Sequence, residues 1–104
     1  MLIVTSESIL GRQIVETKGF VQGSTVRAKH FGRDIAASLK NIVGGELKGY
    51  TELLNESRQE AVERMVQQAQ QLGANAIICV RFSTSAITQQ ASEVLCYGTA
   101  VVVH

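Results

Sequence analysis

One segment near the middle of the chain has the apolar spacing of a long amphipathic α-helix. Apolar side chains recur at helical intervals, and glutamate and glutamine fill most positions between them. Gly73 follows directly and predicts the end of the helix, because glycine adopts the left-handed conformation at little steric cost. Such a helix must bury its apolar face against another element. That face consists of Leu54, Ala61, Val62, Met65, Ala69 and Leu72.

Segments of β character flank this helix on both sides. Residues 2–5 and 14–28 precede it, and the second of these predicts one long bent strand or two short ones, interrupted by Gly19 and Gly23. Residues 76–82 and 93–103 predict two further strands. The polar residues 83–92 between them predict a hairpin connection or a flexible loop.

A further helix is expected from Asp34 to the Gly44-Gly45 pair, with apolar residues at helical spacing. The element order is then β-β-α-α-β-β. We therefore expect an α+β fold with a mostly antiparallel sheet and two helices on one face. The length of 104 residues and the absence of a composition break predict a single domain over residues 1–104.

The last strand predicts self-association. Val101, Val102 and Val103 make it apolar on both faces, whereas helices on one side can cover only one face of a sheet. The chain contains no proline, which commonly protects sheet edges from pairing. We expect a homo-oligomer whose subunits extend or close a sheet together.

Charge and composition exclude several classes of function. There are 10 basic and 9 acidic residues, and the net charge of +1 gives no basic face for nucleic acid. No apolar run approaches the ~20 residues that span a bilayer, so no membrane association is expected. The first residues do not resemble a signal peptide, and the expected location is the cytoplasm.

Two cysteines are the first candidates for a metal site. If the last two strands pair across a turn near residues 84–92, Cys79 and Cys96 can face each other and offer two thiolates to a thiophilic ion. The alternative is that both are small apolar side chains in a sheet, as free cysteines commonly are. His30 and His104 show no metal-ligand spacing with them.

Nothing in the sequence predicts catalysis. The glutamates of residues 52–63 lie on the polar face of the long helix, where solvation is their simplest role. No nucleophile motif and no phosphate-binding glycine loop is present. We therefore expect that the protein is not an enzyme.

The whole chain resembles the YbjQ-like family of small bacterial proteins, which carries the description "putative heavy-metal-binding". The resemblance implies a dodecin-like α+β fold and ring-shaped oligomers, pentamers in particular. It rests on residues 3–5, 11–12, 19, 32–37, 41–45, 49–54, 72–77, 98–101 and 103.

Strong matches to the family also lie near the junction of the two helices, at Arg33, Asp34, Tyr50 and Glu52. Their spacing permits a cluster at a subunit boundary, whose first interpretation is structural and whose second is a ligand site. Family members typically carry acidic residues after the position of Ile77, where this chain has Val80, Arg81 and Phe82. A metal site in this chain would therefore use Cys79 and Cys96. We expect a non-catalytic oligomer that holds a metal ion or small ligand between subunits. The alternative is a structural ring that binds another protein without metal.

Overall fold

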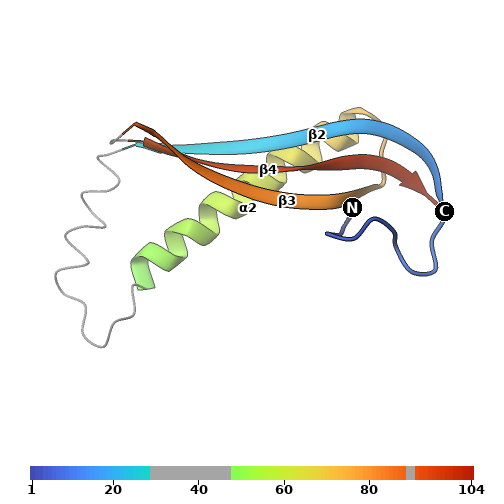
Figure 1. Ribbon diagram of the computed structural model, residues 1–104, viewed down its shortest axis with the longest axis horizontal. Helices are drawn as coiled ribbons and strands as arrows, with labels where there is room; N and C mark the ends of the chain where they lie inside the picture. The colour runs from blue at the N-terminus through green and yellow to red at the C-terminus, as the bar shows by residue number, and fades with distance from the viewer. Residues whose placement is uncertain (29–47, 89–90) are drawn as a thin grey trace.

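A four-stranded sheet with one long helix across its back forms the body of the protein (Figure 1). The computed structural model describes residues 1–28, 48–88 and 91–104. Along the chain these form β1 (Leu2–Ile3), β2 (Ile14–Ala28), α2 (Lys48–Gln71), β3 (Ala76–Thr88) and β4 (Ala91–Val103). The helix expected between Asp34 and Gly44 lies outside the described residues.

The strands lie in the order β1-β3-β4-β2. The long strands pair antiparallel, β4 with β2 and with β3, whereas the two-residue β1 pairs parallel with β3. The expected α+β class and the antiparallel pairing of the long strands are confirmed, and the sheet as a whole is mixed. Residues 14–28 form one long strand whose pairing with β4 is irregular near Val15 and Lys18.

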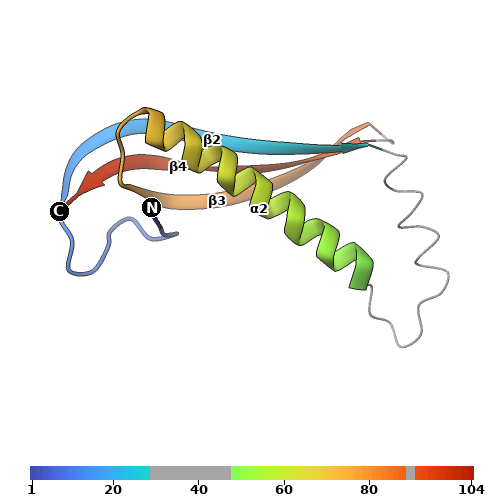
Figure 2. The ribbon, with the colours of Figure 1, turned by 180° about the vertical axis from the view of Figure 1, so that it is seen from behind.

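The helix α2 lies across one face of the sheet (Figure 2) and packs on it through the apolar face that its spacing predicts. Ala61, Met65 and Ala69 are fully buried and contact apolar side chains of the three long strands. Gly73 ends the segment with a positive φ of 81°, as expected. Leu72 differs from the prediction, because it is 42% exposed at the point where the chain leaves the helix. The sheet residues of this core are Val21, Ile77, Val80, Val94, Cys96 and Ala100.

The hairpin connection predicted between the last two strands is confirmed, but its expected bounds of residues 83–92 are too wide. β3 continues to Thr88 and β4 starts at Ala91. Ser83, Thr84 and Ser85 are exposed on both faces of the strand. Polar residues suit a strand that no other layer covers, so their composition reflects the lack of cover and not the lack of a strand.

The expectation that Val101 and Val103 exceed what one subunit can bury is also wrong. Both are at most 4% exposed, and they form a second small core with Ala76. Ile9 and Ile14 pack against this core from the first fourteen residues of the chain. The N-terminal segment therefore covers the sheet face opposite the helix at the end where Val101 and Val103 lie.

Gly23 predicts how sensitive the fold is to the contact between α2 and β2. A Cβ at this position would collide with the Ala61 carbonyl oxygen and the Met65 amide nitrogen, and would lie 2.8 Å from the Cβ of Arg64. Backbone atoms cannot move aside without moving the helix. We expect Gly23→Ala to lower the free energy of unfolding by about 3 kcal/mol or more in denaturant titrations. The exposed control Ser83→Ala should change it by less than about 0.5 kcal/mol. Equal stability of the two variants would contradict the close packing.

Candidate functional site

The two cysteines do not face each other. Cys96 lies opposite Phe82 across the β3–β4 pair, and Ile78 lies opposite Thr99. Between these pairs the register shifts, so that Cys79 and Val80 together occupy the place opposite Gly98. The predicted two-thiol patch is therefore not formed, because the residue opposite Cys96 is Phe82, and Cys79 lies nearer the start of β3.

Cys79 is the residue that carries the irregularity. Its φ is +56°, a left-handed conformation that costs a residue with a side chain on the order of 1 kcal/mol. Its amide donates a hydrogen bond of 3.0 Å to the Ser6 carbonyl oxygen, and the next amide, of Val80, donates to the Val4 carbonyl oxygen at 3.1 Å. The bulge thus joins β3 to the N-terminal segment, and the Cys79 thiol stays half-buried.

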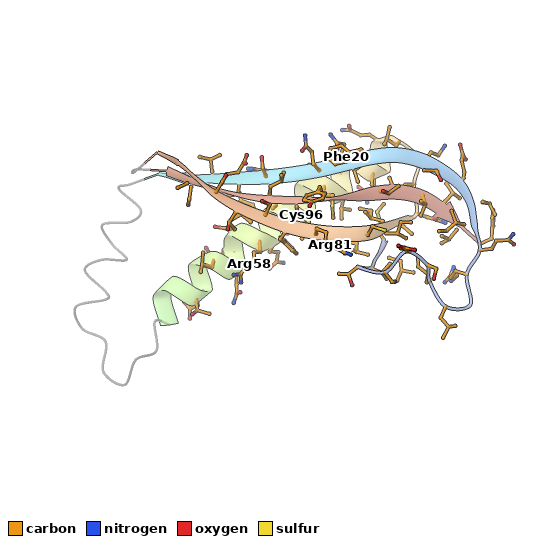
Figure 3. All side chains as sticks on the ribbon, viewed as in Figure 1. Phe20, Arg58, Arg81 and Cys96 are labelled. Atoms are coloured by element: carbon orange, nitrogen blue, oxygen red, sulfur yellow. The ribbon has the colours of Figure 1, made fainter. Side chains whose placement is uncertain are left out.

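Cys96 lies in the layer between the sheet and α2 (Figure 3). Its side chain is fully buried, and its Sγ lies 3.6 Å from the Sδ of Met65. Burial among apolar side chains raises the pKa of the Cys96 thiol, because a thiolate is poorly solvated there. Without a cation beside it, this sulfur stays protonated at neutral pH.

The ligand residues implied by the resemblance are not brought together by the described part of the chain. Arg33 and Asp34 lie outside it, as does His30. Tyr50 and Glu52 lie in the first turns of α2, where Glu52 is exposed. His104 is exposed, and its backbone pairs with Gln13 through bonds of 2.9 and 3.0 Å.

The glutamates of α2 occupy its outer face, as the spacing predicts. Glu52, Glu56 and Glu63 are exposed, and Glu60 forms an ion pair of 3.3 Å with Arg64. An exposed pair at this spacing contributes about 0.3 kcal/mol. Among the described residues, no three histidine, cysteine or acidic side chains gather in a metal-binding group.

Arg64 and Gln68 have a role that sequence reasoning missed. β2 is an edge strand, so alternate backbone groups point away from the sheet. The Gln68 side-chain oxygen accepts the Gln22 amide at 2.7 Å, and the Arg64 guanidinium donates to the Ser24 carbonyl oxygen. They border a shallow polar depression of about 490 Å³, also lined by Gly23, Glu93 and Leu95. The sequence signal that could have predicted this contact is the pair of long polar side chains on the helix together with Gly23 in the strand.

A second cluster that the sequence did not predict lies on the sheet face turned away from α2, here called the open face. Arg81 lies opposite Tyr97 on this face, and the rings of Phe20 and Tyr97 are 6.3 Å apart. Figure 3 labels Phe20 and Arg81. Arg81 donates hydrogen bonds to the carbonyl oxygens of Thr5 and Val80, at 2.8 and 2.9 Å. Two aromatic rings thus adjoin on the open face, and the nearby arginine is bonded to the N-terminal segment.

Asn75 fixes the turn between α2 and β3. Its side chain donates to the Val103 carbonyl oxygen at 2.9 Å and accepts the Val103 amide at 2.7 Å. This pair of hydrogen bonds resembles the pairing between two strands and fixes the end of β4.

Within the described residues, no helix is long and apolar enough to cross a lipid bilayer.

Fold and site together define a small α+β protein with one helix-covered sheet face, one open face and two free thiols. The family whose sequence pattern matches residues 1–104 is described as "Putative heavy-metal-binding". The chain belongs to this YbjQ-like family, whose curated members carry the name UPF0145.

Two relatives and one solved structure illustrate this membership. The chain is 62% identical over 104 residues to a UPF0145 protein from Hahella chejuensis, which covers 100% of both chains. It is 66% identical over 94 residues to one from Acinetobacter baylyi, covering 90% of this chain and 87% of that protein. A crystal structure of a protein of unknown function, from the DUF74 family of Pediococcus pentosaceus, superposes with a TM-score of 0.67 at 18% identity. It covers 100% of this chain and 98% of that chain, and supports the fold alone.

The different burial of the two thiols predicts their reactivity. In the native protein near neutral pH, iodoacetamide should modify Cys79 and leave Cys96 unmodified, because Cys96 is buried and protonated. Intact-mass spectrometry should show one added group in buffer and two in guanidinium chloride. The Cys79→Ser variant should take up none in its native state. Rapid native labelling of that variant would contradict the burial of Cys96.

The raised pKa of Cys96 also predicts a pH dependence of stability. Since the folded pKa lies above the unfolded one, the contribution of this thiol is complete below the ordinary thiol range near pH 9.0. It is lost as the pH rises further, because only the unfolded chain then ionises. The stability difference between wild type and Cys96→Ala should be constant below this pH and shrink above it. Denaturant titrations at a series of pH values measure it, and a constant difference throughout would refute it.

Proposed function

We propose that the protein is a non-catalytic binding protein that acts as a homo-oligomer, with ligand sites at the boundaries between subunits. The observation that carries this proposal is the shape of the subunit. Its radius of gyration is 16.8 Å, and its principal extents are 52 × 28 × 16 Å. A compact domain of this length has a radius of gyration near ~13 Å. A thin, extended subunit is typical of chains that complete their packing against copies of themselves.

The exposed apolar side chains support this proposal. Phe20 is 63% exposed on the open face, Val26 is 54% exposed near the far end of β2, and Phe82 is 49% exposed on β3. Single exposed apolar residues are common in monomers. Here, however, Phe20 adjoins the Tyr97 ring, and Phe82 lies on a stretch of β3 beyond the residues that β1 and the N-terminal segment pair with.

These side chains lie on different surfaces. Phe82 is opposite Cys96, whose side chain contacts α2, so Phe82 lies on the helix side of the sheet. Phe20 is opposite Thr99 and lies on the open face with Tyr97. Contact between two different surfaces is heterologous, and heterologous contacts give a ring where the rotation between subunits closes and a filament where it does not. A ring is the assembly that the family resemblance implies, and a pentamer is the size that we propose.

Subunit boundaries are also where a ligand site is best completed. The description of the family leads us to propose a metal ion as one possible ligand of this chain. In the residues that the structure describes, no three donors of the usual kinds gather, so a many-coordinate site would draw on residues beyond this set. Arg33, Asp34, Tyr50 and Glu52 remain our proposed set for a small ligand.

A second candidate is a ring that binds another protein without metal. The feature that favours it is the outer face of α2, where exposed glutamate and glutamine side chains run along the whole helix. Such a polar surface offers many hydrogen-bonding groups to a partner. This candidate shares the homo-oligomer with the first and differs in the ligand.

The oligomer is tested by removing the two phenylalanines. Native mass spectrometry and light scattering should find one discrete ring for the wild type and monomers for the Phe20→Ser/Phe82→Ser variant. The matched control is Leu10→Ser, which removes an apolar side chain that is 102% exposed elsewhere on the subunit. The control should keep the ring. A monomeric wild type would refute the proposal.

The same spectra, recorded with Zn(II), Ni(II) or Cd(II), separate the two candidates. Metal sites at the subunit boundaries are supported if an ion binds the ring in fixed proportion and does not bind the monomeric variant. A ring that binds none of these ions favours the protein-binding alternative.

A further inference from the structure

We propose that the sulfur atoms of Cys96 and Met65 form a binding site for one soft monovalent metal ion, such as Cu(I) or Ag(I), inside each subunit. Both donors come from one chain, so this site does not depend on the proposed oligomer. It replaces the Cys79–Cys96 pair that the register excludes. It also differs from a boundary site in needing no residue outside the described part of the chain.

The two sulfurs are already close enough to share an ion. The Cys96 Sγ lies 3.6 Å from the Met65 Sδ. With metal–sulfur bonds of about 2.3 Å, this separation gives an S–metal–S angle of about 100°. Small rotations of the flexible Met65 side chain can open the angle further. The backbone holds the pair together, because Gly23, opposite Cys96 in β2, lies directly beneath the Met65 amide.

The surroundings select the kind of ion. The core around the pair is made of Val21, Ile77, Val80, Val94 and alanines of α2. The buried residues that the structure describes include no carboxylate or imidazole, which harder cations prefer. Thiolate and thioether sulfurs are soft donors and favour Cu(I) over hydrated divalent ions.

Charge balance points to a single positive charge. When the metal–sulfur bond forms, the Cys96 S–H bond breaks and its proton passes to water, while a lone pair of the Met65 thioether completes the coordination. No electron is transferred. A monovalent ion with one thiolate is neutral, and a neutral pair avoids the large cost of a buried net charge. A divalent ion would leave a net positive charge in this core.

Phe82 provides the way in. It is opposite Cys96 on the same face of the sheet and is 49% exposed. α2 packs mainly over β2 and β4 and contacts β3 least, so the β3 side of Cys96 has less cover from the helix. We place the approach of the ion on this flank, beside Phe82.

The test uses the Cys79→Ser protein, in which Cys96 is the remaining thiol of the chain. The reduced protein is titrated with Ag(I), which is redox-inert, and with Cu(I) in competition with a chromophoric chelator. Native mass spectrometry should show one Ag(I) or Cu(I) ion per chain, whatever the oligomeric state, and added Zn(II) should not displace it. Met65→Leu in this background preserves the core volume and should weaken binding at least about tenfold, because even groups that only orient metal ligands contribute that much. Cys96→Ala should abolish it.

Three results would overturn the proposal: no ion on the Cys79→Ser protein, binding that survives Cys96→Ala, or unchanged affinity in Met65→Leu. The last result would mean that the thioether only packs against the thiol. Should Met65→Leu fail to fold, X-ray absorption of the Ag(I)-loaded Cys79→Ser protein decides the question. Two sulfur neighbours support the site, and one sulfur with lighter atoms refutes it. Ion binding by a monomer would support this site and refute the proposed oligomer.

Discussion

The rest of the structure depends on the contact between α2 and the edge strand β2. At Gly23 the strand has no side chain, and the backbone of α2 at Ala61 and Met65 lies directly on it. This contact fixes the height and position of the helix over the sheet. Consequently Met65 reaches Cys96 on the neighbouring strand, and Arg64 and Gln68 reach the outer edge of β2.

Local patterns predicted the elements well where one layer covers one face. The spacing of Ala61, Met65 and Ala69 identified the helix and its buried side, and Gly73 identified its end. Where the cover is missing, the same rules gave the wrong element. Ser83, Thr84 and Ser85 are polar because both faces of that stretch meet solvent, and a polar strand has the composition of a loop.

The candidate site was harder to predict because it depends on long-range register. The register between β3 and β4 decides which side chain faces Cys96, and no local pattern reports it. The sulfur of Met65 was assigned correctly to the buried face of the helix, yet its contact with Cys96 follows only once the helix is placed on Gly23. Likewise, the burial of Val101 and Val103 depends on Ile9, more than ninety positions earlier in the chain.

The side chains that α2 lays along β2 have a consequence for how sheets of this protein can grow. Arg64 and Gln68 occupy backbone groups of one edge, while the distal part of β3 at the other edge stays available. A stack that adds strands at both edges without limit, as amyloid does, needs two free edges on every subunit. The two side chains of α2 occupy one amide and one carbonyl group of β2 and so hinder such growth at this edge. In a chain without proline, part of the protection of a sheet edge thus comes from the helix.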